Sequence, residues 1–193
     1  MRVVAAFVTS AAAAGGFPTD GLPELAMVGR SNVGKSTLIN ALVRQKVART
    51  SAAPGKTRLA NFYRVTPEGR PPFHLVDLPG FGYARGGDST REEFDALVAA
   101  YFTSRPGAKV LVLVDSRHPG LDADRSAWNW LGRLGADRHA VATKLDKLTR
   151  AERGRHLSEL ERIYSGPVTP VSAQTGEGLD ALWKTIVSLL TRP

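Results

Sequence analysis

The sequence of 193 residues contains no cysteine. This absence excludes disulfide bonds, thiolate metal sites and cysteine nucleophiles, and it is typical of proteins from reducing compartments. No apolar run approaches the roughly 20 residues that a membrane-spanning helix needs. The apolar stretch from Val3 to Val8 is broken by Thr9 and Ser10, so we interpret it as a strand and not as part of a secretion signal. We therefore expect a cytoplasmic protein that is not bound to a membrane.

Acidic residues are scarce relative to basic ones, since 18 Asp and Glu stand against 26 Lys and Arg, for a net charge of +8. The excess is concentrated in one segment without acidic residues, which carries Arg44, Lys46, Arg49, Lys56 and Arg58. A basic surface of this kind attracts phosphate backbones and acidic surfaces. The alternative is a solvated face that only keeps the protein soluble.

Apolar residues alternate between strand and helix periods along the chain. Strands are predicted near the N-terminus and at 24–28, 60–65, 73–78, 109–115, 139–144 and 166–172. Helices are predicted at 35–44, 91–102, 149–164 and 179–190. A further helix is predicted to begin at Asp122 or Asp124 and to end at Leu134. The short connection at 66–72 indicates an antiparallel hairpin. The alternation predicts an α/β fold, with a mostly parallel sheet of six or seven strands, one antiparallel strand, and helices on both faces.

The stretch "GRSNVGKS", from Gly29 to Ser36, fits the phosphate-loop pattern G-x-x-x-x-G-K-[ST]. It follows a predicted strand and opens a predicted helix, which is the context that this motif requires. Its glycines allow a tight turn in which several N–H groups point at one anion, and the helix N-terminus adds partial positive charge. Lys35 would reach the β- and γ-phosphates, and the Ser36 hydroxyl would bind Mg²⁺.

Two further motifs point to a nucleotide switch. In "DLPG", Asp77 would lie in the second shell of the Mg²⁺ ion and the Gly80 N–H would contact the γ-phosphate. A loop bonded only to the γ-phosphate loses its anchor on hydrolysis. In "PGKTR", Thr57 is the candidate for a second Mg²⁺ hydroxyl ligand.

Two more motifs follow later strands and indicate guanine. In "TKLDK", Asp146 could accept two hydrogen bonds from the guanine edge, whereas adenine would leave this carboxylate unpaired. Lys144 would lay its apolar stem along the base. In "SAQTG", the N–H groups of Ala173 and Gln174 could meet the guanine O6.

These motifs in this order resemble the EngB (YihA/YsxC) family of bacterial ribosome-assembly GTPases, in the TrmE-Era-EngA-EngB-septin-like group. The resemblance rests on "GRSNVGKSTLIN", "ARTSAAPGKTR", "DLPGFGYA" and "TKLDKL". It implies a Ras-like G domain that hydrolyses GTP to GDP as a switch in large ribosomal subunit assembly, needed for normal cell division and septation. The implied partners are GTP, GDP and the large-subunit precursor with its rRNA, bound by a monomer, with no role for DNA.

We expect one domain over residues 1–193, with an N-terminal strand and flexible segment in 1–23 and the nucleotide-binding core in 24–193. The residues with an expected catalytic role are Lys35, Thr57 and Gly80. The residues expected to bind the nucleotide are Gly29, Arg30, Ser31, Asn32, Val33, Gly34, Lys35, Ser36, Thr37, Gly55, Lys56, Thr57, Arg58, Leu59, Asp77, Leu78, Pro79, Gly80, Thr143, Lys144, Leu145, Asp146, Ser172, Ala173 and Gln174.

Three positions depart from the Ras-type pattern or add to it. Phe81 stands where Ras-type switches place a water-orienting glutamine, so we expect slow intrinsic hydrolysis. Thr143 replaces the asparagine of N-K-x-D, which predicts weaker guanine affinity and a hydroxyl that ties the loop to backbone. By resemblance to the TrmE group, Asn32 would help to hold a K⁺ ion beside the phosphates; otherwise it only shapes the loop.

Two other functions remain open at this point. One is a P-loop small-molecule kinase, although the sequence shows no lid insertion and "TKLDK" favours guanine. The other is a division protein that holds GTP without hydrolysing it, which Phe81 keeps open.

Overall fold

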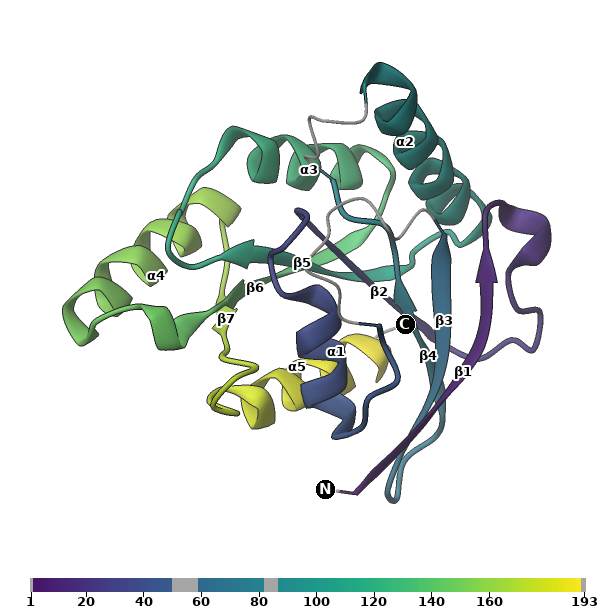
Figure 1. Ribbon diagram of the computed structural model, residues 1–193, viewed down its shortest axis with the longest axis horizontal. Helices are drawn as coiled ribbons and strands as arrows, with labels where there is room; N and C mark the ends of the chain where they lie inside the picture. The colour runs from purple at the N-terminus through teal and green to yellow at the C-terminus, as the bar shows by residue number, and fades with distance from the viewer. Residues whose placement is uncertain (1, 50–58, 82–86, 192–193) are drawn as a thin grey trace.

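The computed structural model describes residues 2–49, 59–81 and 87–191. Within these ranges, strands and helices alternate as the sequence predicts (Figure 1). The strands are β1 (Val3–Ala11), β2 (Glu24–Gly29), β3 (Ala60–Pro67), β4 (Phe73–Asp77), β5 (Lys109–Asp115), β6 (Asp137–Thr143) and β7 (Val168–Pro170). The helices are α1 (Lys35–Val43), α2 (Gly87–Ser104), α3 (Asp122–Arg133), α4 (Arg150–Tyr164) and α5 (Leu179–Thr191), with short 3-10 helices η1 (Ala14–Gly16) and η2 (Leu145–Lys147).

All seven strands form one sheet in the order β1-β3-β4-β2-β5-β6-β7. Strand β3 runs antiparallel to both of its neighbours, β1 and β4, and the other neighbouring pairs are parallel. The predicted α/β class and the single antiparallel strand are therefore confirmed. Because β2 lies between β4 and β5, the loops that follow these three strands leave the sheet side by side.

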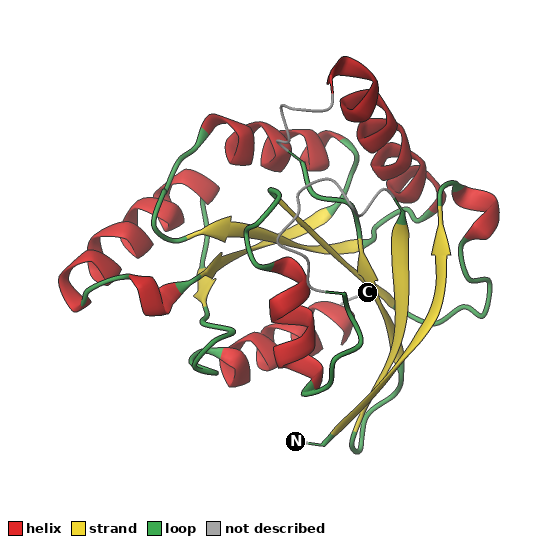
Figure 2. Ribbon diagram, in the orientation of Figure 1, coloured by secondary structure: helices red, strands yellow, loops and turns green. Residues whose placement is uncertain are grey.

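Helices cover both faces of the sheet (Figure 2). Helices α1 and α5 pack on one face, while α2 and α3 pack on the other, with α4 beside α3. Strand β2 serves both layers, because Leu25 and Met27 face α1 and α5 whereas Ala26 and Val28 face α2 and α3. This two-sided burial explains why the central strands are continuous apolar runs. No helix in the described ranges is long and apolar enough to cross a membrane.

The N-terminal segment belongs to the same sheet. Strand β1 pairs with β3 along its length, with a register shift between Phe7 and Thr9. The chain then forms η1 and places Phe17 in the core, where its ring centroid lies 5.4 Å from that of Phe62 and 5.7 Å from that of Tyr101. These aromatic contacts attach the segment before β2 to β3 and α2.

Candidate nucleotide-binding site

The sequence motifs meet at one edge of the sheet. The phosphate loop follows β2, "DLPG" follows β4, "TKLDK" follows β6 and "SAQTG" follows β7. In parallel sheets this carboxyl-end edge is the usual place for ligands. A hollow of about 180 Å³ lies here, lined by Val33, Gly34, Thr37, Leu38, Thr143, Lys144, Asp146, Lys147, Val171, Ala173 and Gln174. The structure thus brings the phosphate-loop and guanine motifs together.

The phosphate loop leaves the N-terminus of α1 open. Gly34 precedes the helix with φ of 102°, and Asn32 has φ of 65°, so the loop turns through two left-handed positions. Among the described residues no side chain caps α1, and its first turn contains no acidic residue. By contrast, Thr149 and Glu152 form a capping box at α4. The N–H groups at the start of α1 are therefore available to an anion.

Lys35 and Asp77 form an ion pair inside this edge. The Lys35 ammonium donates a hydrogen bond to Oδ1 of Asp77. Both residues are buried, with exposed fractions of 8% and 2%. Burial of a paired charge is tolerated only when the partner stays in place, so this contact fixes the first turn of α1 against the end of β4.

The loop after β4 is joined to the phosphate loop by backbone contacts. Ser31 N–H donates to Phe81 O at 3.0 Å, and Phe81 N–H donates to Gly29 O at 3.2 Å. Gly80 lies so close that a Cβ there would be 3.2 Å from Gly29 O and from Ser31 N. The Phe81 ring packs against Phe94 at a centroid distance of 6.2 Å. Phe81 is thus part of the apolar layer under α2 and α3, and its ring supplies no group that could orient water.

Thr143 ties the guanine loop to the phosphate loop. Its Oγ1 lies 2.8 Å from Val33 O and 3.1 Å from Val114 O. The prediction that this hydroxyl binds backbone is therefore confirmed. The side chain is buried at the bottom of the site, so the hydroxyl serves the protein's own structure at this position.

Asp146 is oriented by the last motif. Ser172 donates a hydrogen bond from Oγ to Oδ1 of Asp146 at 2.7 Å, and its Oγ also accepts from Thr175 N–H at 3.1 Å. The hydrogen bond from Ser172 is the main cause that lowers the pKa of Asp146, and Lys147 adds to it. The carboxylate is therefore ionised at neutral pH and turned toward the hollow that the base would occupy.

Asp115 belongs to the site although the sequence analysis did not select it. Its Oδ2 accepts a hydrogen bond from Lys144 Nζ at 2.9 Å, and its carboxylate accepts two from the Arg117 side chain, at 2.9 and 2.7 Å. Burial acts to raise the pKa of Asp115, but the hydrogen bonds from Arg117 and Lys144 outweigh it and hold the pKa well below its usual range. Lys144 Nζ also donates to Asn32 O at 2.7 Å, so Lys144 connects the guanine loop with the phosphate loop, and Asp115 holds Lys144 in place. The available signal was its place at the end of an apolar strand, as for Asp77.

Seven further predicted residues fall into three groups. Leu78 and Leu145 have buried side chains, so only their backbone can face a nucleotide. Leu59 is partly exposed next to the start of β3. The other members of the second Mg²⁺ motif lie outside the described residues: Gly55, Lys56, Thr57 and Arg58.

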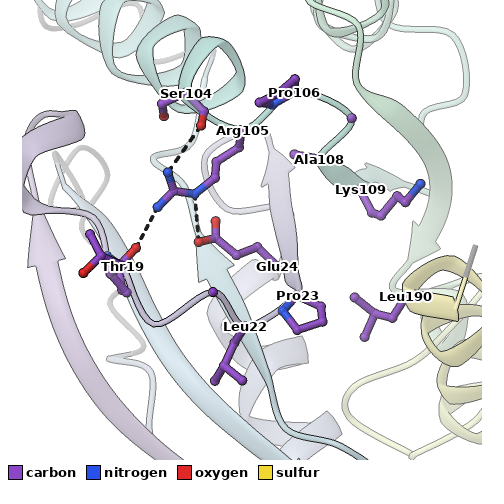
Figure 3. A pocket seen from close by; sticks show the side chains of 13 residues that line it. Thr19, Leu22, Pro23, Glu24, Ser104, Arg105, Pro106, Ala108, Lys109 and Leu190 are labelled. Carbon is purple, nitrogen blue, oxygen red and sulfur yellow. Dashed lines mark hydrogen bonds and ion pairs between the residues drawn. The ribbon is translucent and has the colours of Figure 1, made fainter. Parts of the chain in front are cut away.

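A larger hollow of about 590 Å³ lies near the amino ends of β2 and β5 and contains none of the predicted residues (Figure 3). Arg105 crosses it, donating from Nε to Glu24 Oε1 at 3.0 Å and from Nη2 to Pro18 O at 2.7 Å. Tyr101 also donates to Glu24, at 2.8 Å. These bonds attach the N-terminal segment to the end of α2, which gives the polar groups of this hollow a structural role.

Known proteins share both the sequence and the fold. A family model described as "50S ribosome-binding GTPase" matches residues 24–144. The "Probable GTP-binding protein EngB" of Symbiobacterium thermophilum is 41% identical over 222 residues, covering 96% of this chain and 95% of that protein.

Solved structures agree with this relationship. A crystal structure of a probable GTP-binding protein engB has a TM-score of 0.65 at 23% identity, covering 86% of this chain and 98% of that chain. A crystal structure of Era in complex with MgGDPNP and nucleotides 1506–1542 of 16S ribosomal RNA has a TM-score of 0.76 at 25% identity. It matches 89% of this chain, which spans 57% of the Era chain. The extent and identity of the sequence match show that this chain belongs to the EngB family of GTP-binding proteins and is a GTP-hydrolysing enzyme.

Proposed function

We propose that this GTPase binds GTP and GDP at the edge of the sheet described above and acts as a monomeric nucleotide switch. Its partner would be the precursor of the large ribosomal subunit, in the cytoplasm, and normal cell division and septation would depend on it. The observation that carries the proposal is the convergence of an uncapped phosphate loop, Asp77 and Asp146 at one edge. The description of the matching family model as ribosome-binding supports the choice of partner.

The geometry suggests how the triphosphate would enter. The free N–H groups of α1 would receive the β-phosphate, and Lys35 would exchange its present partner, Asp77, for phosphate oxygens. The exchange keeps the ammonium paired with an anion throughout, which avoids the cost of a buried unpaired charge. It also frees the Asp77 carboxylate at the moment when a cation arrives with the nucleotide.

The residues present fit a Mg²⁺ ion that is held mainly by phosphate oxygens. The described residues contain no group of three or more His, Cys, Asp or Glu side chains that could hold a metal alone. Ser36, in the first turn of α1, and Asp77, at the end of β4, provide the hydroxyl and the carboxylate that this type of site uses. Thr57 would complete the set. The ion would neutralise charge on the β- and γ-phosphates.

Hydrolysis would be sensed by the loop after β4. Gly80 is packed against Gly29 O and Ser31 N, so this residue lies beside the phosphate loop, where its N–H would meet a γ-phosphate. Phe81 is partly buried and packs against the core, so no side chain at that position aligns water, and we expect a low rate without further help. A K⁺ ion near Asn32 is the proposed source of that help.

A basic loop follows α1 and offers a surface for rRNA. Arg44, Lys46 and Arg49 are exposed in the described part of the loop after α1. Asn40 fixes the start of this loop, because its Oδ1 accepts from Val47 N–H at 2.9 Å and from Ala48 N–H at 2.8 Å. The loop therefore presents its cations from a defined position at the carboxyl end of α1. In the sequence it leads directly to the second Mg²⁺ motif, through which an RNA contact could respond to the nucleotide.

The nucleotide part of the proposal is tested by calorimetry with GTP, GDP and ATP. We expect binding of both guanine nucleotides and none of ATP, and loss of GTP binding in Lys35→Ala. Equal uptake of ATP and GTP would contradict the proposal.

The ribosomal part is tested by sedimentation with large-subunit precursors, in GDP and in a non-hydrolysable GTP analogue. Binding should favour the analogue, and the slope of log affinity against log salt should fall by about one in Arg49→Gln. Arg155→Gln is the matched control, because Arg155 is also an exposed arginine but lies on α4, outside the basic loop. Equal affinity in the two nucleotide states would count against a switch.

A further inference from the structure

Arg30 directs its side chain away from the phosphate loop toward α3. Its Nε donates a hydrogen bond to Oδ1 of Asp124 at 3.0 Å, across 94 positions of sequence. Arg30 keeps 27% of its side chain exposed, whereas the Asp124 side chain is 1% exposed. The contact therefore joins the nucleotide edge to a carboxylate in the first turn of α3.

The backbone of Arg30 makes the bridge to the loop after β4. Arg30 and Phe81 form an isolated parallel bridge, with Ser31 N–H donating to Phe81 O and Phe81 N–H donating to Gly29 O. The two neighbours of Arg30 thus make the backbone contacts to the residue after Gly80, while the Arg30 side chain makes the contact to α3. The ion pair with Asp124 therefore restrains the residue at the centre of this bridge.

The bridge reaches α3 by a second route. Phe81 packs against Phe94 of α2, and Phe94 packs against Trp130 of α3, each at a centroid distance of 6.2 Å. Helix α3 therefore supports the bridge from two sides, through the Asp124 ion pair and through a chain of three rings. Two supports at different points fix both the position and the tilt of the bridged loops.

Burying the Asp124 carboxylate has a free-energy cost. Its Oδ2 is buried and has no hydrogen-bond partner among the described residues. Burial is the largest cause that raises the pKa of Asp124, Arg30 opposes it, and the nearby charge of Asp115 adds to it. An apolar residue would fill such a position more cheaply, so the carboxylate needs a reason that stability alone does not provide.

We propose that Asp124 is a positioning residue for GTP hydrolysis, which acts by holding Arg30 and so keeps Gly80 against the phosphate loop. The inference rests on the proposed contact between Gly80 N–H and the γ-phosphate. The Asp124 carboxylate faces Arg30 and not the nucleotide edge, so its effect would pass through Arg30. It follows that the residue matters for the state that contains a γ-phosphate and hardly matters for GDP.

The test is Asp124→Asn, which keeps the shape of the side chain and removes its charge. Asp122→Asn is the matched control, because Asp122 lies in the same first turn of α3 and is exposed. We expect Asp124→Asn to lower kcat about tenfold and to weaken a non-hydrolysable GTP analogue by about the same factor, with GDP affinity changed less than twofold. This tenfold loss corresponds to about 1.4 kcal/mol. Asp122→Asn should match the wild type in kcat, in affinity for the GTP analogue and in affinity for GDP.

A second background separates positioning from general damage. In Arg30→Gln, the further change Asp124→Asn should have no additional effect on kcat, because the contact is already lost. Circular dichroism and thermal unfolding show whether each variant is folded. The inference is overturned if Asp124→Asn equals Asp122→Asn, if its effect persists undiminished in Arg30→Gln, or if GDP and the analogue weaken equally. If the wild type shows no preference for guanine over adenine nucleotides, the proposed function is contradicted, independently of the result for Asp124→Asn.

Discussion

The Oγ of Ser172 lies 2.7 Å from Oδ1 of Asp146, and this bond joins the last two loops of the nucleotide edge. The hydrogen bond does two things for a carboxylate that must read a base. It stabilises the ionised form by lowering the pKa of Asp146 further, and it fixes the rotamer. Asp146 can then accept from guanine N1–H and the exocyclic amine without first losing side-chain freedom.

Replacing Ser172 by alanine tests this orientation. We expect Ser172→Ala to weaken GDP and GTP alike by about fivefold, which corresponds to the ~1 kcal/mol of one ordinary hydrogen bond. Titration with a fluorescent GDP analogue measures the change. Thr175→Ala is a suitable control, because Thr175 contacts Ser172 through its backbone N–H, which the substitution retains. A Ser172→Ala affinity equal to that of the wild type would show that Asp146 needs no support.

Asp146 itself sets which purine is bound. Asp146→Asn replaces an acceptor by a donor, so the N–H groups of guanine meet a mismatched edge, whereas xanthine offers a carbonyl there. We expect GTP affinity to fall by at least tenfold and xanthosine triphosphate to become the preferred nucleotide. Competition between the two nucleotides gives the answer directly. If Asp146→Asn still prefers GTP to xanthosine triphosphate, the base does not bind at Asp146.

Asp115 predicts how stability depends on pH. Its pKa is held below the ordinary carboxyl value of about 4, so its contribution is complete above that value and is lost as the pH falls below it. Asp115→Asn should lower stability at pH 7 by about 2 kcal/mol, because a buried charge-assisted network loses its acceptor. It should also flatten the acid limb of the stability curve below about pH 4. Denaturant unfolding at pH 7 and pH 3 checks both, and equal losses at the two pH values would contradict the assignment.

The fold was predictable because its signals are local. Because β2 and β5 are buried on both faces, they are continuous apolar runs, which are typical of a parallel sheet covered by helices. The glycine spacing of the phosphate loop predicts its tight turn. Parallel topology then requires that the loops after such strands share an edge. The motifs could therefore be assembled into a site from spacing alone.

The contacts that hold the site together were not predictable in the same way. The Lys144–Asp115 pair joins residues 29 positions apart and the Arg30–Asp124 pair joins residues 94 apart. No sequence spacing predicts either ion pair, because each depends on how α3 and the loops after β5 and β6 pack in the folded protein. Acidic residues are common in the first turn of a helix, so the sequence gives Asp122 and Asp124 the same interpretation. Only the burial of Asp124 in the structure distinguishes the two.

Asn32 allows the K⁺ proposal to be separated from its structural alternative. Its backbone is left-handed, with φ of 65°, and its carbonyl oxygen accepts from Lys144, so a loop-shaping role alone would explain asparagine there. Glycine adopts the same conformation at no steric cost. Asn32→Gly therefore preserves the turn and the carbonyl while removing the side-chain amide.

If the amide helps to hold K⁺, the wild type should hydrolyse GTP faster in potassium than in sodium buffer at equal ionic strength, and Asn32→Gly should lose that difference. A positive charge beside the phosphates is worth most in the transition state, so kcat should change more than GDP affinity does. Steady-state phosphate release in the two salts, for both proteins, measures this. Equal wild-type rates would remove the K⁺ proposal, and a salt preference that survives in Asn32→Gly would leave Asn32 with the loop-shaping role.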